Sequence, residues 1–296
     1  MANRKRTILL YGRTRSGKTT LIGELAEFVK KSGLGITRLY TIDRGGTWSI
    51  QPYIELGVVE VIAQEETDPW TFLHHAVRGH VRDDKRKWIN GDNGKVGLFA
   101  FESMTAWADA LMESLAEKAA NGLNVGGTAN VNFTVGEQSD VILKVGGNNQ
   151  SHYNVVQTRI TGEVWKSQNL VAPYILWTAS VAKDDDQVNV GKVLGPAVTG
   201  KALTAEIPRW FDLTFRVDAV AAQAGKSERH VIYLGNSMDT NAGNATTLGN
   251  TRIPKDSPEL PSSIEPASLV KAIQLIDGGY NVALDAVKKR MALAKP

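Results

Sequence analysis

The 296-residue chain contains no cysteine. Disulfides and thiolate metal sites are therefore excluded, and the chain suits a reducing compartment such as the cytoplasm. Long apolar runs are also missing, because no stretch approaches the roughly 20 apolar residues of a membrane span. The basic residues at the N-terminus are followed only by a short apolar run at residues 7–11. We expect that run to be a strand rather than part of a signal peptide.

A large excess of charge of one sign is missing as well. The chain has 34 Lys and Arg residues against 31 Asp and Glu residues, a formal net charge of +3. This balance neither demands nor excludes a nucleic-acid partner, since only a local basic patch would matter. The length allows one large α/β domain or a core with an appendage.

The most specific feature present is residues 12–19, which read Gly-Arg-Thr-Arg-Ser-Gly-Lys-Thr. They match the G-x-x-x-x-G-K-T pattern, in which glycines allow backbone N–H groups to wrap a phosphate chain. In this pattern Lys18 reaches the β- and γ-phosphates, and the Thr19 hydroxyl holds Mg²⁺. The predicted cofactors are ATP and Mg²⁺, with nucleotide contacts from Gly12, Arg13, Thr14, Arg15, Ser16, Gly17, Lys18, Thr19 and Thr20.

The flanks of this loop support the interpretation. Residues 7–11 read as a buried parallel strand, and residues 20–31 place apolar side chains at helical spacing before Gly33. The loop then lies between a strand and a helix, with the helix N-terminus directed at the phosphates. The alternative, a glycine-rich turn with a solvated lysine, does not require these flanks.

Later strands and helices alternate along the chain. This alternation predicts an α/β fold with a mainly parallel sheet and helices on both faces. The predicted strands are residues 36–42, 58–63, 96–101 and 174–179. The next predicted helix starts at residues 67–69, with its apolar face formed by Trp70, Leu73, Val77 and Val81. The later helices place Met104, Trp107, Leu111 and Leu115, and then Tyr153, Val156, Ile160 and Val164, toward the core.

The remaining segments interrupt or extend this alternation. Residues 121–150 are rich in Gly and Asn and are expected to be a mobile loop or hairpin insertion. Residues 184–186 are expected to be a turn, and residues 214–219 and 230–234 antiparallel strands. We divide the chain into a core over residues 1–235 and an extension over residues 236–296, formed by a polar loop and helices at 266–276 and 281–294.

Three polar residues follow predicted strands, at the sheet edge where a nucleotide is expected. Glu102 could orient Mg²⁺ through water, or it could be a helix-capping acid. Asp43 could polarise the attacking water, or it could be a turn residue. Ser180 could sense the γ-phosphate, although serine is common at strand ends. The predicted catalytic residues are therefore Lys18, Glu102, Asp43 and Ser180, with Thr19 and Glu102 at the metal.

The chain resembles the RecA-like P-loop ATPases encoded by bacteriophages, including those related to single-strand annealing proteins. The resemblance covers roughly residues 5–276. Beyond the loop, it is carried by Ile-Asp at 42–43 with Gly-Gly at 45–46, and by Phe-Ala-Phe-Glu-Ser at 99–103. It is also carried by residues 195–201, 207–212 and 250–254.

The resemblance implies a RecA-like P-loop NTPase core that forms rings or filaments, with ATP at the subunit interface. A basic residue would then reach in from a neighbouring subunit, and Lys201 and Arg209 are the candidates, unless they are ordinary surface charges. Two departures indicate slow hydrolysis. Gly45 stands where the family has its catalytic glutamate, and Glu102 stands where it has an aspartate.

The leading functional hypothesis is a phage ATPase of DNA metabolism, acting in recombination, annealing or replication in the host cytoplasm. Single-stranded DNA would meet residues 121–150, although this insertion offers only Lys144 as a cation and Phe133 as an aromatic residue. The alternatives are a DNA-packaging or motor ATPase, and a nucleotide-gated assembly protein with little hydrolysis. A small-molecule kinase is disfavoured, because the chain shows no arginine-rich lid.

Overall fold

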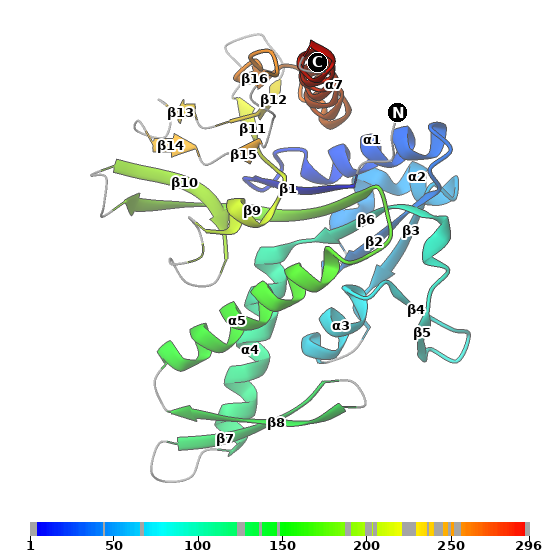
Figure 1. The fold of residues 1–296 in the computed structure, drawn as a ribbon. Helices are drawn as coiled ribbons and strands as arrows, with labels where there is room; N and C mark the ends of the chain where they lie inside the picture. Colours follow the sequence, from blue (N-terminus) through cyan, green and yellow to red (C-terminus); the bar gives the residue numbers. More distant parts are fainter. Residues whose placement is uncertain are drawn as a thin grey trace.

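The computed structural model of the protein has an α/β fold whose central sheet is mostly parallel and has helices on both faces (Figure 1). It describes residues 5–43, 45–65, 68–122, 128–135, 138–146, 149–186, 191–198, 203, 206–220, 229–235, 237–239, 245–247, 250–251 and 256–293. None of the helices in these ranges is both long and apolar enough to cross a membrane.

The centre of the sheet is a run of parallel strands in the order β3-β2-β6-β9-β1-β11. Their bounds are β1 (Arg6–Gly12), β2 (Ile36–Thr41), β3 (Val59–Ala63), β6 (Val96–Glu102), β9 (Tyr174–Asp186) and β11 (Leu213–Val220). Beyond β11 the sheet continues with antiparallel neighbours, namely β12 (Arg229–Tyr233), β15 (Asn250–Thr251) and β16 (Ser263–Ile264). The predicted antiparallel pair at residues 214–219 and 230–234 is confirmed.

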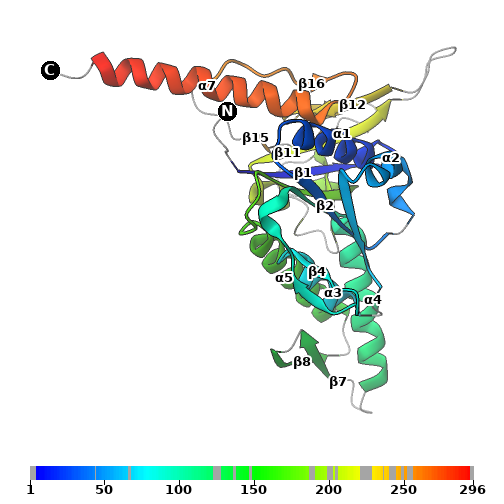
Figure 2. The same ribbon diagram turned by 90° about the vertical axis from the view of Figure 1, so that its right-hand side faces the viewer.

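The outer half of β9 leaves the parallel region and pairs with β10 (Gly191–Ala197), to which β14 (Ala245–Thr247) and then β13 (Ser237–Asp239) are added. Two hairpins form sheets of their own. They are β4 (His80–Arg82) with β5 (Trp88–Asn90), and β7 (Thr128–Val135) with β8 (Gln138–Gly146). The second hairpin confirms the predicted insertion and lies at the far end of α4 (Figure 2).

The helices divide between the two faces of the sheet (Figure 1). One face carries α1 (Lys18–Lys31), α2 (Gln51–Glu55) and α7 (Leu269–Leu293), and the other carries α3 (Pro69–Ala76), α4 (Met104–Gly122) and α5 (Asn149–Ser167). Short 3₁₀ turns are η1 (Gly46–Ile50), η2 (Asn93–Lys95) and η3 (Ile207–Trp210). Strand β1 contributes side chains to the hydrophobic cores on both faces of the sheet. Ile8 and Leu10 face the first set of helices, and Leu9 and Tyr11 face the second. Burial on both faces explains its continuous apolar sequence.

Four sequence expectations about local structure are wrong. Residues 184–186 belong to β9 rather than to a turn, because pairing with β10 extends that strand. Helix α3 ends at Ala76, ahead of Gly79 at φ +71°, so Val81 lies in β4 instead of on a helical face. Tyr153 is exposed, although Val156, Ile160 and Val164 are buried as expected.

The fourth expectation concerns the C-terminus, where one helix replaces the predicted two. Helix α7 continues through Gly278 and Gly279, and its second half extends beyond the sheet (Figure 2). A Cβ at Gly279 would lie 3.4 Å from Cβ of Ser257, which is ordinary van der Waals contact, so the loop before α7 packs beside this glycine. At the other end, Glu24 of α1 accepts a 2.8 Å hydrogen bond from the Leu269 N–H and one from the Ser268 hydroxyl, which caps α7.

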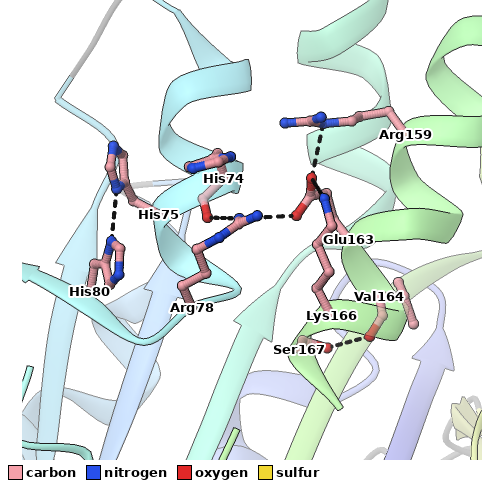
Figure 3. Close-up of polar contacts among 9 residues, drawn as sticks. All are labelled: His74, His75, Arg78, His80, Arg159, Glu163, Val164, Lys166 and Ser167. Carbon is pink, nitrogen blue, oxygen red and sulfur yellow. Dashed lines mark hydrogen bonds and ion pairs between the residues drawn. The ribbon is translucent and has the colours of Figure 1, made fainter. Parts of the chain in front are cut away.

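Helices α3 and α5 are joined by ion pairs to one fully buried carboxylate, that of Glu163 (Figure 3). The guanidinium of Arg159 lies 3.1 Å and the ammonium of Lys166 lies 3.0 Å from its Oε1, while Arg78 of the α3 end lies 3.5 Å from Oε2. His74 lies beside these cations, and burial together with the charge of Arg78 lowers its pKa to about 3. Burial, with the positive charges around Glu163 as a smaller cause, therefore keeps this imidazole neutral.

Candidate functional site

The loop between β1 and α1 depends on two glycines. A Cβ at Gly12 would lie 2.0 Å from the carbonyl oxygen of Val217 on β11, so no larger residue fits between the two strands. Gly17 precedes α1 with φ +93°, a conformation that L side chains rarely adopt. The predicted strand, loop and helix are confirmed, and the α1 N-terminus faces the loop.

The Lys18 ammonium is held against the loop that precedes it. It donates hydrogen bonds to the carbonyl oxygens of Gly12, at 2.9 Å, and Arg13, at 2.8 Å. Burial lowers the pKa of Lys18, and the Glu102 carboxylate acts in the opposite direction. The loop thus holds a partly desolvated cation next to the first turn of a helix, which is an arrangement suited to an anion.

Thr19 and Glu102 meet at the edge of the sheet. The Thr19 hydroxyl donates a 2.5 Å hydrogen bond to Glu102 Oε1. Glu102 is only 7% exposed, and its second oxygen, Oε2, is buried without a hydrogen-bond partner. Burial raises the pKa of Glu102, whereas the Thr19 hydrogen bond and Lys18 lower it. An unpartnered buried carboxylate oxygen beside a hydroxyl is a donor set that fits a hard divalent cation.

Asp43 lies in a turn beyond β2, not on a strand. Its Oδ1 accepts a 2.9 Å hydrogen bond from the Gly45 N–H, and its own N–H donates to the Thr41 hydroxyl at 3.1 Å. Asp43 therefore occupies a turn position, because β2 ends at Thr41, one residue before the predicted strand end at residue 42. A Cβ at Gly46 would lie 3.6 Å from Asp43 Oδ2 and 3.8 Å from Glu102 Cδ, so both carboxylates lie next to this glycine.

A cavity of about 630 Å³ collects these groups. Its lining includes the four predicted catalytic residues, Lys18, Glu102, Asp43 and Ser180, together with loop residues 14–20. Gly12 and Arg13 lie outside the lining and contribute the carbonyl oxygens that hold Lys18. Of the two trans-acting candidates, Arg209 is on η3 and is not part of this lining, and Lys201 lies outside the described residues.

Ser180 is fixed through a threonine of α4. Its N–H donates to the Thr105 hydroxyl oxygen at 2.9 Å, and that hydroxyl donates to the Ala197 carbonyl oxygen at 2.5 Å. Thr105 thereby joins α4 to β9 and β10 at the cavity wall. Sequence reasoning missed Thr105 and Asp109, which both line the cavity one and two turns into α4.

Sequence reasoning also missed His230, which reaches the loop from a distant strand. Its Nδ1 lies 3.0 Å from the Ser16 carbonyl oxygen, and its ring lies beside Gly17. The loop and β12 are more than two hundred residues apart, and they meet because β12 pairs with β11, which pairs with β1. A signal for this contact is absent from the sequence around His230, since it depends on strand order.

Comparison with known protein families finds no family model that matches the chain, and comparison with curated proteins finds no matching sequence. The described residues contain no group of three or more His, Cys, Asp or Glu side chains that could hold a metal ion by themselves. A cation at Thr19 and Glu102 would thus take its other ligands from a bound anion and from water.

Proposed function

We propose that the protein binds Mg-ATP on residues 12–20 and hydrolyses it slowly, as a phage ATPase of DNA metabolism with a RecA-like P-loop core. The parallel strand order is compatible with a P-loop fold and equally with Rossmann-like folds, so the proposal depends on the site. The observation that carries it is the meeting of Lys18, Thr19 and Glu102 in one cavity at the head of α1.

Each residue has a role set by its position. Backbone N–H groups of the loop and the N-terminus of α1 bind the phosphate chain, and Lys18 exchanges its carbonyl partners for phosphate oxygens. Thr19 and Glu102 would hold Mg²⁺, and the unpartnered Oε2 of Glu102 fits that role. When bound, Mg²⁺ neutralises the negative charge that develops on the phosphates.

The water-activating part of the site is weak. Asp43 is the carboxylate available near Glu102, but its Oδ1 already accepts the Gly45 N–H. Gly45 itself supplies no side chain. General-base help is worth about a hundredfold to ten-thousandfold in rate, so its partial loss agrees with slow turnover. Ser180, which also lines the cavity, would contact the γ-phosphate.

The proposed subunit and DNA partners are based on the resemblance to phage RecA-like ATPases rather than on the fold. We propose a homo-oligomer, a ring or filament, in which Arg209 or Lys201 of one subunit completes the site of the next. Single-stranded DNA is the proposed substrate partner, and the host cytoplasm is the proposed location. A nucleotide-gated assembly protein is the second candidate function, because the turn that holds Asp43 leaves the site without a free general base of the expected kind.

ATP titration of Lys18→Ala tests the binding proposal, since this variant is expected to lose ATP binding while keeping the melting temperature. Lys30→Ala, on the exposed last turn of α1, is the matched control and should bind normally. ATP turnover with and without single-stranded DNA then separates the two functions. Stimulation by DNA supports the ATPase, and binding without turnover supports the assembly protein. Unchanged affinity in Lys18→Ala would remove the site assignment.

A further inference from the structure

A second cavity, of about 440 Å³, adjoins the first at the start of α1. The two linings have Ser16, Gly17, Thr20 and His230 in common. The second cavity therefore lies beside the same loop residues that line the first cavity. Its size is within the range of about 300–1,000 Å³ that is usual for small-molecule sites.

We propose that this second cavity binds the sugar and base of the nucleoside triphosphate whose phosphates lie on the loop. The inference rests on the proposed function and adds where the nucleoside lies and which residues select it. A triphosphate chain bound on the loop and at Thr19 must carry its nucleoside into adjoining space. The second cavity offers that space next to Thr20, on the first turn of α1.

The character of the lining suits a nucleoside. Leu21, Pro266 and Ala267 supply apolar surface for the flat faces of a base. Arg229 and Glu265 supply polar groups for its edge. A mainly apolar wall with a few polar groups is the usual composition of a site that fixes the orientation of a small ligand.

The polar pair is able to change partners. The Arg229 guanidinium lies 2.7 Å from the Glu265 carboxylate, and the two side chains are 52% and 42% exposed. An exposed ion pair of this kind contributes little to stability, so little is lost when its members turn to a ligand. The carboxylate accepts hydrogen bonds from base N–H groups, and the guanidinium donates to base acceptors, as arginine does to purine edges. We assign base selection to this pair.

His230 marks the junction between the phosphate and nucleoside parts of the site. Its hydrogen bond to the Ser16 carbonyl oxygen and its place beside Gly17 fix the ring at the wall that both cavities share. Strand β12 also carries Arg229, so one strand positions both a junction residue and a base-reading residue.

The experiment compares Mg²⁺ complexes of ATP, GTP and inorganic triphosphate by isothermal titration. In the wild type, ATP or GTP should bind about tenfold more tightly than inorganic triphosphate, or better, because only the nucleotides use the second cavity. Ala267→Trp fills that cavity and should bring nucleotide affinity down to that of triphosphate, while triphosphate affinity stays unchanged. Ser262→Trp, an exposed position in the same segment, is the matched control and should behave as wild type.

Glu265→Gln and Arg229→Ala change exposed side chains and serve if Ala267→Trp fails to fold. Each should alter the ATP-to-GTP affinity ratio by about tenfold, the value of one good base contact, without altering triphosphate binding. Equal wild-type affinities for nucleotide and triphosphate, or a folded Ala267→Trp that binds ATP normally, would overturn the inference. If Lys18→Ala still binds both nucleotide and triphosphate, the result would instead count against the phosphate site. A failure of the nucleoside site and a failure of the phosphate site are therefore distinguishable.

Discussion

The hydroxyl of Thr19 donates a 2.5 Å hydrogen bond to Oε1 of Glu102, which joins the first turn of α1 to the end of β6. The other carboxylate oxygen stays buried and unpartnered. Because burial raises the pKa of Glu102, the folded protein disfavours the ionised form of this carboxyl group. A group that costs stability while it faces a cavity is a candidate for ligand binding.

Glu102→Gln should therefore raise the stability of the ligand-free protein by on the order of 1 kcal/mol at neutral pH, since a neutral amide is less costly to bury than a carboxylate. The same variant should lose the Mg²⁺ dependence of ATP binding. Thermal melting without ligand and ATP titration with and without Mg²⁺ measure the two effects. A variant that melts at a lower temperature and keeps its Mg²⁺ response would make Glu102 a structural residue.

Gly45→Glu tests the proposed cause of slow turnover. Gly45 has φ −77°, and a Cβ there would meet only Asp43 Oδ1, at 3.4 Å, so a side chain fits. The variant should change the free energy of unfolding by no more than about 0.5 kcal/mol, as an ordinary surface substitution does. ATP turnover should rise by about a hundredfold if the new carboxylate activates water.

Gly45→Gln is the matched control, because it adds the same volume without a base. Its turnover should stay at the wild-type value. Equal rates in Gly45→Glu and Gly45→Gln, with both variants folded, would remove any catalytic role from this position. Asp43→Asn completes the set and should lower the residual rate, unless Asp43 only closes the turn through its hydrogen bond to the Gly45 N–H.

The parts of this site that the sequence predicts are those set by neighbours in the chain. The loop, its strand and its helix lie within residues 6–31, and strand ends predict Glu102 and Ser180 because parallel strands end at one edge. The continuous apolar runs of β1 and β6 also follow from burial on both faces.

The parts that it does not predict depend on pairing between distant segments. His230 reaches the loop only through the order β1-β11-β12, and β9 continues through three aspartates only because β10 pairs with it. The strand before Asp43 ends at Thr41, one residue earlier than predicted, where the Thr41 hydroxyl accepts from the Asp43 N–H and Asp43 Oδ1 accepts from the Gly45 N–H. Local propensity is a weak guide where tertiary contacts decide.

Glu163→Gln should be strongly destabilising, because it leaves Arg78, Arg159 and Lys166 around a neutral amide. Removing one partner of a buried ion pair costs about 3–5 kcal/mol. Glu27→Gln is the matched control. Its partner Lys31 is exposed, so only a small loss of stability is expected. Urea unfolding of both variants measures the difference, and equal losses would mean that the Glu163 ion pairs do not join α3 to α5.

The imidazoles beside this cluster make stability depend on pH. Burial is the main cause that lowers the pKa of His74 to about 3 and of His75 to about 4. For His74 the charges of Arg78, His75, Arg159 and Lys166 add to it, and for His75 those of His80 and Arg78. An unfolded histidine has a pKa of about 6.5, so the unfolded chain binds more protons below that pH. The contribution of both residues to stability is complete above about pH 6.5 and decreases as the pH falls toward the folded values.

Urea unfolding between about pH 6.5 and pH 5 should therefore show a free energy of unfolding that decreases with pH, and His74→Gln should flatten this slope. Glu102 acts in the opposite direction, because its raised pKa lets the folded state bind a proton at a higher pH than the unfolded chain does. The comparison is best made in a Glu102→Gln background, where that contribution is absent. A slope that His74→Gln and His75→Gln leave unchanged there would show that neither imidazole has a lowered pKa in the folded protein.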